Sequence, residues 1–197
     1  YYRLARNNLH MAWRSFRLGA NYYDSGLGDS AWLLHGLVRS MKPKVCVEIG
    51  SARGKSTCHI AQALRENLDG RLYAIDPHHA TDWNDAGERD TLPALRRNLR
   101  AMGGEAYVEI IRSGSAEAAR RWKRPIDLLF IDGDHSYDAC KADIAAWAPF
   151  VKRGGVIAFH DFGSRADGVT RAIFEATKAE RFAEIVGVAN TIIAFRM

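Results

Sequence analysis

Short apolar runs alternate with stretches of helical period along most of the chain. The runs that we expect to form strands are Lys44–Ile49, Arg71–Asp76, Ala106–Arg112, Ile126–Asp132, Val156–Asp161, Arg181–Val188 and Thr191–Arg196. The stretches that we expect to form helices between and after the first five strands are Gly54–Asn67, Asp90–Met102, Ser115–Trp122, Tyr137–Val151 and Val169–Ala179. Such strand–helix alternation predicts a parallel sheet with helices on both faces.

The last two expected strands are separated only by Ala189 and Asn190. So short a connection requires an antiparallel hairpin, because parallel neighbours need a long crossover. We therefore predict an α/β domain of the doubly wound, Rossmann-like class. Its seven-stranded sheet has five parallel strands and a C-terminal antiparallel hairpin.

The N-terminal region differs from the rest, and we divide the chain into a helical arm or cap at 1–41 and a main domain at 42–197. Leu9, Trp13 and Phe16 share one helical face, while arginines occupy the other. We expect this basic amphipathic segment to pack on its own domain or on a second subunit of a homo-oligomer, in preference to a membrane surface. A second short helix is expected at Ala31–Met41.

Composition narrows the class of protein. No apolar run approaches the roughly 20 residues of a membrane-spanning helix. The three cysteines lack metal or disulfide spacing and are typical of reduced thiols, so we expect a cytoplasmic location. The net charge of +5 is a mild excess, and without a basic stripe interleaved with aromatic residues it disfavours nucleic acid as a partner. The basic run Arg120–Arg124 is interpreted as solvated surface or an oligomer contact.

A glycine-containing turn follows the first expected strand, in Glu48-Ile49-Gly50-Ser51-Ala52-Arg53-Gly54-Lys55-Ser56-Thr57. The Gly-Lys-Ser segment suggests a phosphate-binding loop, but that motif needs one more residue between its glycines. A nucleotide hydrolase dependent on Lys55 is therefore kept as an alternative. The spacing acidic-x-Gly-x-x-x-Gly instead resembles the first motif of class I S-adenosylmethionine-dependent methyltransferases.

This resemblance implies S-adenosylmethionine as the cofactor. Asp76, at the end of the second strand, is placed to accept both ribose hydroxyls, although it could also be a turn residue before Pro77. Ser115 could contact the adenine or simply cap the next helix. The residues expected to bind the cofactor are Glu48, Gly50, Ser51, Gly54, Ser56, Asp76, Ser115 and Asp132.

Carboxylates follow two strands that we expect to be neighbours. The fourth strand leads into Asp132, Asp134 and His135, and the fifth ends in His160 and Asp161. In doubly wound sheets, ligands bind beyond the carboxyl ends of the strands. Adjacent carboxylates repel one another unless a cation lies between them, and oxygen ligands of this kind suit Mg²⁺, Mn²⁺ or Ca²⁺.

At this point the segment from about Val45 to Phe162 resembles the metal-dependent O-methyltransferases of the natural-product and sugar type. Macrolide-sugar enzymes belong to this group, and catechol-type and cephalosporin-hydroxylase-like proteins are its relatives. The matching motifs are Asp-Gly-Asp-His-x-Tyr and Gly-Gly-Val-Ile-Ala-Phe-His-Asp. The resemblance implies that Asp132, Asp161 and the residue at position 160 bind a divalent metal. It implies that His135 is the general base, with Asp134 as the alternative.

Position 160 departs from the relatives, which carry an acidic residue there. The resemblance implies magnesium or manganese, whereas a histidine ligand would shift the preference toward Mn²⁺, Fe²⁺ or Zn²⁺. A His160 that points away from the site and a site without metal are the alternatives. The predicted function is metal-assisted methylation of a hydroxyl on a small molecule such as a sugar, polyketide or phenol. A non-catalytic, ligand-binding member of the fold stays open. The expected acceptor loops are His78–Glu88 and Phe162–Asp167.

Overall fold

The computed structural model describes residues 27–79, 90–163, 167–179, 182–189 and 191–197, with the side chains of Asp29 and Asp167 excepted. The N-terminal amphipathic segment and most of the expected acceptor loop at 78–88 lie outside these residues. Among the described helices, none has the length and apolar character that crossing a membrane requires.

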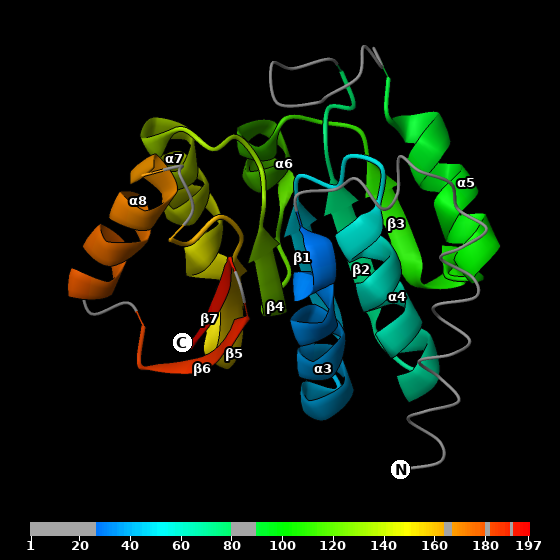
Figure 1. Ribbon diagram of the computed structural model, residues 1–197, viewed down its shortest axis with the longest axis horizontal. Coiled ribbons are helices and arrows are strands. Elements are labelled where there is room, and N and C mark those ends of the chain that lie inside the picture. The colour runs from blue at the N-terminus through cyan, green and yellow to red at the C-terminus, as the bar shows by residue number, and fades with distance from the viewer. Residues whose placement is uncertain (1–26, 80–89, 164–166, 180–181, 190) are drawn as a thin grey trace.

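The strands form one seven-stranded sheet in the order β3-β2-β1-β4-β5-β7-β6. Strands β1 to β5 run parallel, and β7 pairs antiparallel with both β5 and β6 (Figure 1). This confirms the predicted five parallel strands and terminal hairpin. The strand bounds are β1 Val45–Ile49, β2 Arg71–Ile75, β3 Val108–Ile111, β4 Ile126–Ile131, β5 Val151–Phe159, β6 Glu184–Ala189 and β7 Ile192–Arg196.

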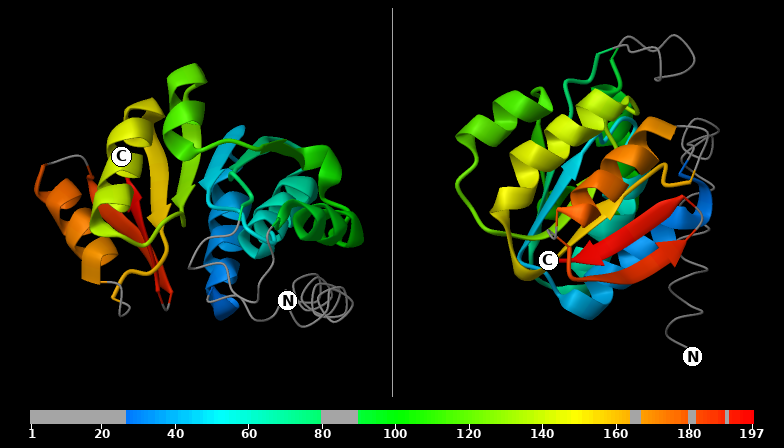
Figure 2. Two further views of the ribbon diagram at one scale, coloured as in Figure 1. Left: turned by 90° about the horizontal axis from the view of Figure 1, so that it is seen from above. Right: turned by 90° about the vertical axis from the view of Figure 1, so that its left-hand side faces the viewer.

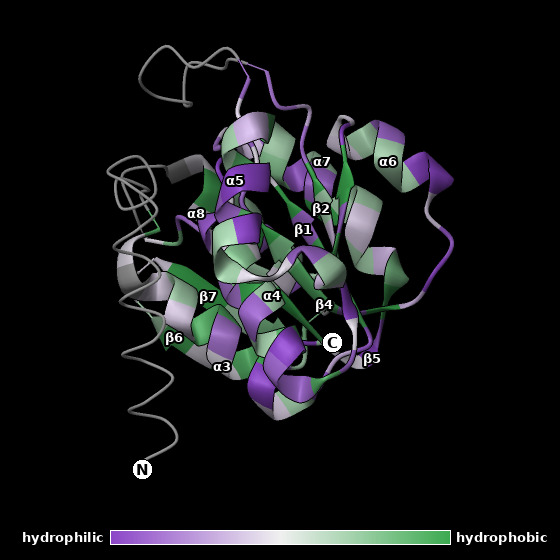
Figure 3. Cartoon of the chain, turned by 90° about the vertical axis from the view of Figure 1, so that its right-hand side faces the viewer, coloured by the Kyte–Doolittle hydropathy of each residue, from purple (hydrophilic) through white to green (hydrophobic). Residues whose placement is uncertain are grey.

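Helices cover both faces of this sheet (Figure 2). The apolar sides of α3 and α4 pack on one face, with α5 against α4, while α6, α7 and α8 pack on the other. In Figure 3 the buried strands are largely hydrophobic, whereas the helices carry both hydrophobic and hydrophilic residues. The helix bounds are α3 Ala31–Met41, α4 Lys55–Asn67, α5 Leu92–Met102, α6 Ser115–Arg121, α7 Tyr137–Trp147 and α8 Asp167–Lys178.

Strand β5 begins earlier than the sequence pattern predicts. A helix through Val151 was expected, but α7 ends at Trp147 and a short 3-10 helix covers Ala148–Phe150. Pro149 explains the difference, since it lacks the N–H that an α-helix would need there. Strand β5 then starts at Val151, and its polar first half is tied to the end of the chain by hydrogen bonds between Gly154 N and Met197 O and between Met197 N and Gly155 O.

Residues of the expected N-terminal cap and of the basic run contribute to the core. Helix α3 buries Ala31, Leu34 and Val38 against the sheet, and the division of the chain at residue 41 stays a prediction. In the basic run, Trp122 is buried and the Arg124 guanidinium lies 5.2 Å from the centre of the Tyr73 ring. The arm proposed for the preceding residues stays a prediction.

The turn after β1 and the turn after β4 touch at Gly50. The backbone N–H of Gly50 donates to Ile75 O, and that of Asp132 donates to Ile49 O. Gly50 has a φ of +85°, and a Cβ at this position would lie 2.0 Å from the carbonyl oxygen of Asp132. Only glycine therefore allows the two turns to approach this closely.

We predict that Gly50→Ala lowers the free energy of unfolding by about 2–4 kcal/mol, because it combines backbone strain with a clash against backbone. Gly114→Ala is the matched control, since nothing lies within 4 Å of its added Cβ and its φ is negative. The control should cost less than about 1 kcal/mol. Urea denaturation measures both, and equal losses would contradict this account of Gly50.

Candidate cofactor and metal site

The turn from Gly50 to Gly54 is shaped by alternating left-handed residues. Gly50, Ala52 and Gly54 have φ values of +85°, +40° and +90°. The resulting bend turns two backbone N–H groups toward β2, where Asp76 Oδ2 accepts them from Ser51 at 3.0 Å and from Ala52 at 2.8 Å. The other Asp76 oxygen accepts the N–H of His78 at 2.6 Å. Asp76 thus holds the turn in place, in addition to any contact with a ligand.

Glu48 is fully buried beneath the same turn. Its carboxyl group accepts the Ser56 hydroxyl and, at 2.6 Å, the Thr57 hydroxyl, which anchors the first turn of α4. Burial raises the pKa of Glu48 to about 8 in spite of these hydrogen bonds. Glu48 and Ser56 therefore contact each other, and their expected contact with a cofactor stays a prediction.

Ser115 lies at the start of α6, and its hydroxyl is engaged by two residues of α7. It donates to Asp143 Oδ1 and accepts the indole N–H of Trp147 at 2.9 Å. Burial raises the pKa of Asp143 to about 6. Neither partner could be predicted from the sequence, because one acidic residue on a half-apolar helix gives no sign that it is buried. The structure leaves the role of Ser115 toward adenine as a prediction.

The second half of the site is a cluster of two carboxylates and two imidazoles, defined here as the four-residue cluster of Asp132, His135, His160 and Asp161. One potential ligand atom from each lies within 4.8 Å of all the others. His160 Nδ1 is 3.0 Å from Asp132 Oδ1 and 3.0 Å from Asp161 Oδ2. His135 Nε2 is 2.9 Å from Asp161 Oδ2 and 3.8 Å from Asp132 Oδ1. The predicted ligand residues and the predicted base are thus brought together.

Backbone conformation explains how two successive residues join this cluster. Neighbouring side chains on a strand point to opposite faces. Asp161 has a φ of +57°, a left-handed conformation that turns its carboxylate back toward His160. Aspartate tolerates this conformation better than most residues, although it costs free energy. The other imidazole nitrogen of His160 lies 2.9 Å from the Thr191 hydroxyl, a partner with no signal in the sequence pattern.

The charges in the cluster stabilise one another. Hydrogen bonds to Asp132 and Asp161 raise the pKa of His135 to about 9. Burial opposes a charge on His160, but hydrogen bonds to the same carboxylates raise its pKa to about 10. Burial also opposes a charge on Asp161, yet the two histidines hold its pKa well below the usual range. Two carboxylate and two imidazole donors around one point fit a divalent metal, especially one that accepts nitrogen.

Asp134 lies outside this cluster. Its Oδ1 accepts the N–H of Ser136 at 2.7 Å, and Ser136 Oγ in turn accepts the N–H of Ala139 to cap α7. The pKa of Asp134 is lowered by the hydrogen bond from the Ser136 N–H. The described contacts of Asp134 are therefore those of a turn residue at the start of a helix.

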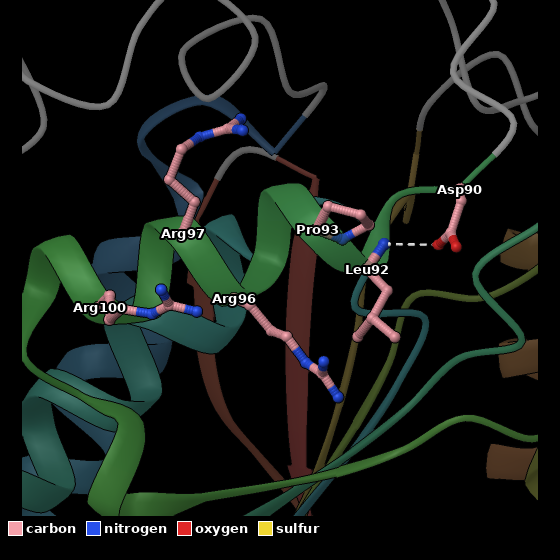
Figure 4. A pocket seen from close by; sticks show the side chains of 6 residues that line it. All are labelled: Asp90, Leu92, Pro93, Arg96, Arg97 and Arg100. Atoms are coloured by element: carbon pink, nitrogen blue, oxygen red, sulfur yellow. Dashed lines mark hydrogen bonds between the residues drawn. The ribbon is translucent and has the colours of Figure 1, made fainter.

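A basic hollow lies beside α5 (Figure 4). It is lined by Asp90, Leu92, Pro93, Arg96, Arg97 and Arg100. Asp90 accepts the N–H of Leu92 and pairs with Arg112, so it acts at the start of the helix. Neither Asp76 nor the four-residue cluster lines this hollow, and we do not assign it a part in the site.

Sheet order places the two halves of the site side by side. Strand β1 pairs with β2 on one side and with β4 on the other, so the chain reverses direction across the sheet between β1 and β4. Ligands of doubly wound sheets bind at such a switch point, beyond the carboxyl ends of the strands. The glycine turn, Asp76 and the four-residue cluster all follow carboxyl ends of strands. The carboxyl ends of β1, β2 and β4 lie at the upper edge of the sheet in Figure 1.

The buried carboxyl of Glu48 predicts a pH-dependent stability. A group whose folded-state pKa is raised from 4.5 to about 8 stabilises the fold fully below pH 4.5 and loses that contribution as the pH rises to 8. Glu48→Gln removes the titrating carboxyl group, so its free energy of unfolding should lack this pH dependence. The difference in free energy of unfolding between the unmodified protein and Glu48→Gln should therefore fall by roughly 1.4 kcal/mol per pH unit between pH 4.5 and 8. Denaturant titrations from pH 5 to 8 test this. Glu117→Gln, on the surface of α6, is the control, and its free energy of unfolding should follow that of the unmodified protein across this pH range. If the free energy of unfolding of Glu48→Gln also ran parallel to that of the unmodified protein, the raised pKa of Glu48 would be contradicted.

Comparisons with known proteins agree with this geometry. A family model described as a methyltransferase domain matches residues 47–162. The uncharacterised protein y4gI of Sinorhizobium fredii is 29% identical over 150 residues, which cover 71% of this chain and 16% of that protein. The chain thus spans about a sixth of the length of this curated relative.

Solved structures share the fold at low sequence identity. An O-methyltransferase candidate from Klebsiella pneumoniae is 18% identical with a TM-score of 0.72, covering 93% of this chain and 89% of that one. The Bacillus cereus O-methyltransferase in complex with S-adenosylhomocysteine is 17% identical with a TM-score of 0.67, covering 97% and 90%. TomG of Streptomyces achromogenes, which acts in tomaymycin synthesis and was solved with S-adenosylmethionine, is 17% identical with a TM-score of 0.64, covering 86% and 80%.

These findings confirm the resemblance to class I methyltransferases and the doubly wound fold expected from it. They give no support to the nucleotide hydrolase that the Gly-Lys-Ser segment had left open. The match extends from β1 to the residue after Asp161, and so includes the glycine turn, Asp76 and the four-residue cluster. The chain belongs to the family of methyltransferase domains.

Proposed function

We propose that this domain transfers a methyl group from S-adenosylmethionine to a hydroxyl of a small molecule, assisted by a divalent metal at the four-residue cluster. The observation that carries the proposal is the contact between Gly50 and Asp132, which places the glycine turn directly beside the cluster. A methyl donor held by the turn and an acceptor held at the cluster would then be neighbours. Proximity and orientation account for much of the catalysis of such a transfer.

The proposed cofactor site follows the carboxyl ends of β1 and β2. The turn from Gly50 to Gly54 brings backbone close to the ligand, and Asp76 offers a carboxylate to the ribose. Its Oδ2 already accepts two backbone N–H groups and its Oδ1 accepts one, so Oδ1 retains a lone pair for a hydroxyl donor. The neighbours bound to S-adenosylhomocysteine and S-adenosylmethionine support the choice of this cofactor.

Asp132, His160 and Asp161 are the proposed metal ligands, and His135 is the proposed base. A divalent metal, when bound, lowers the pKa of an acceptor hydroxyl that it contacts. His135 Nε2 faces the two carboxylates, which keep the ring protonated in the metal-free protein. A metal that displaced protons from the cluster would favour neutral His135, which would then take the hydroxyl proton, and Asp161 at 2.9 Å would stabilise the imidazolium so formed. We prefer His135 to Asp134 for this role because Asp134 is engaged in the turn before α7.

The acceptor is proposed to be a small molecule, with a sugar, a polyketide or a phenol as the classes to test first. The side chains of His135, Asp132 and Asp161 keep 26%, 18% and 16% exposure, so the cluster is recessed but open to solvent. The roles of the fold neighbours, O-methyltransfer and tomaymycin synthesis, favour a hydroxyl on a compound of this size.

Calorimetric titration with S-adenosylhomocysteine in EDTA tests the cofactor. We expect binding that Asp76→Asn weakens at least about tenfold, because a charge-assisted acceptor is lost beside the ribose. Asp69→Asn is the matched control, since Asp69 caps Gly70 at the opposite end of β2. Binding of ATP without binding of S-adenosylhomocysteine would refute the proposed cofactor.

Binding of Mn²⁺, followed by electron paramagnetic resonance, tests the metal. We expect Asp161→Asn to weaken binding by more than about a hundredfold, since losing a ligand should exceed the effect of losing an outer partner. Asparagine also tolerates the left-handed conformation of this position, so the backbone should be kept. Asp138→Asn, an exposed residue of α7, should bind like the unmodified protein. If the unmodified protein binds no Mn²⁺, metal assistance is wrong and methyl transfer by this domain is metal-free.

A further inference from the structure

The turn between β6 and β7 contacts the proposed metal site through Thr191. Its hydroxyl oxygen lies 2.9 Å from His160 Nε2, and its carbonyl oxygen accepts the N–H of Phe162 at 2.9 Å. Two separate contacts from one residue thus reach the segment that carries His160 and Asp161. The hairpin that closes the sheet also holds one side of the four-residue cluster.

The geometry of His160 restricts what each of its nitrogens can do. Nδ1 is 3.0 Å from both Asp132 Oδ1 and Asp161 Oδ2, so it points to the centre of the cluster. Nε2 points away, toward Thr191. The side chain is 6% exposed, which leaves water little access to either nitrogen. A metal at the cluster could therefore reach His160 only through Nδ1.

A nitrogen that binds a metal must present a lone pair, so the proton of the neutral imidazole must lie on the other nitrogen. Here that nitrogen is Nε2, and Thr191 Oγ1 is the atom placed to accept its proton in a hydrogen bond. We propose that Thr191 is a positioning residue that fixes His160 as an Nδ1 ligand and thereby makes the cluster select Mn²⁺, or a similar nitrogen-accepting metal, over Mg²⁺. This inference rests on the proposed metal-assisted function.

The selectivity follows from the donor set. Mg²⁺ prefers an octahedral shell of oxygen atoms, several of them from water. An imidazole held rigidly at the metal position supplies a nitrogen that transition metals accept readily. If Thr191 did not hold the ring, His160 could rotate away and leave Asp132 and Asp161 as an oxygen site. The hydroxyl of Thr191 therefore controls which metals the site prefers, without touching the metal.

The first experiment observes His160 directly, in the metal-free protein. Nuclear magnetic resonance with ¹⁵N-labelled histidine should show a slowly exchanging Nε2–H of His160 in the unmodified protein. In Thr191→Val this proton should exchange faster, and in Thr191→Ser it should stay protected because the hydroxyl is kept. The raised pKa of His160 means that both ring nitrogens carry protons in the metal-free chain near neutral pH, so the experiment reads the contact between the Nε2–H and Thr191. An Nε2–H that exchanges equally fast in the unmodified protein and in Thr191→Val would overturn the inference.

The second experiment compares metal affinities. We expect the unmodified protein to bind Mn²⁺ more tightly than Mg²⁺, and Thr191→Val to weaken Mn²⁺ binding about ten- to a hundredfold, as loss of an outer partner does in other metal sites. Thr170→Val is the matched control. Thr170 accepts the N–H of Gly163 and so supports the same loop without contacting His160.

The outcomes separate this inference from the function on which it rests. Equal loss of Mn²⁺ affinity in Thr191→Val and Thr170→Val would show that Thr191 merely supports the loop, and would overturn the inference alone. Mn²⁺ binding unchanged by Thr191→Val, or Mg²⁺ bound as tightly as Mn²⁺, would do the same. Absence of Mn²⁺ binding by the unmodified protein, in contrast, contradicts the proposed metal assistance itself.

Discussion

The contact between the backbone at Gly50 and the backbone at Asp132 is the constraint on which the site depends. It exists because no side chain separates the two turns, and a single Cβ would overlap the Asp132 carbonyl. On one side of this contact, Asp76 holds the glycine turn through two N–H groups. On the other side, strand β4 delivers Asp132 to the cluster. The methyl-donor side and the acceptor side of the proposed reaction therefore share one fixed reference point.

Much of this arrangement could be predicted because it depends on local pattern. Strand β4 is buried at every position, so its sequence is a continuous apolar run. The short link between the last strands required a hairpin, and the carboxyl ends of β4 and β5 had to lie together once the sheet was parallel. From these constraints Asp132 and Asp161 were expected to face one another, and only the family resemblance added His160 to them. The structure places all three together.

The features that could not be predicted depend on residues distant in sequence or on backbone conformation. Thr191 contacts His160 only because β7 lies beside β5, and its hydroxyl has no pattern that marks it. The left-handed conformation of Asp161 is not encoded by residue type, since aspartate adopts many conformations. Ser115 is engaged by Asp143 and Trp147 because α6 packs on α7, a tertiary contact that periodicity does not specify.

The position of β7 between β5 and β6 has a consequence for biosynthesis. Strand β5 is made before β7, and its outer edge exposes unpaired backbone groups until the last strand emerges and inserts. Such an edge can pair with other chains while it waits. The same insertion brings Thr191 to His160, so the proposed metal ligand gains this hydrogen-bond partner only when the sheet closes. A nascent chain that carries every cluster residue would thus still lack a finished site.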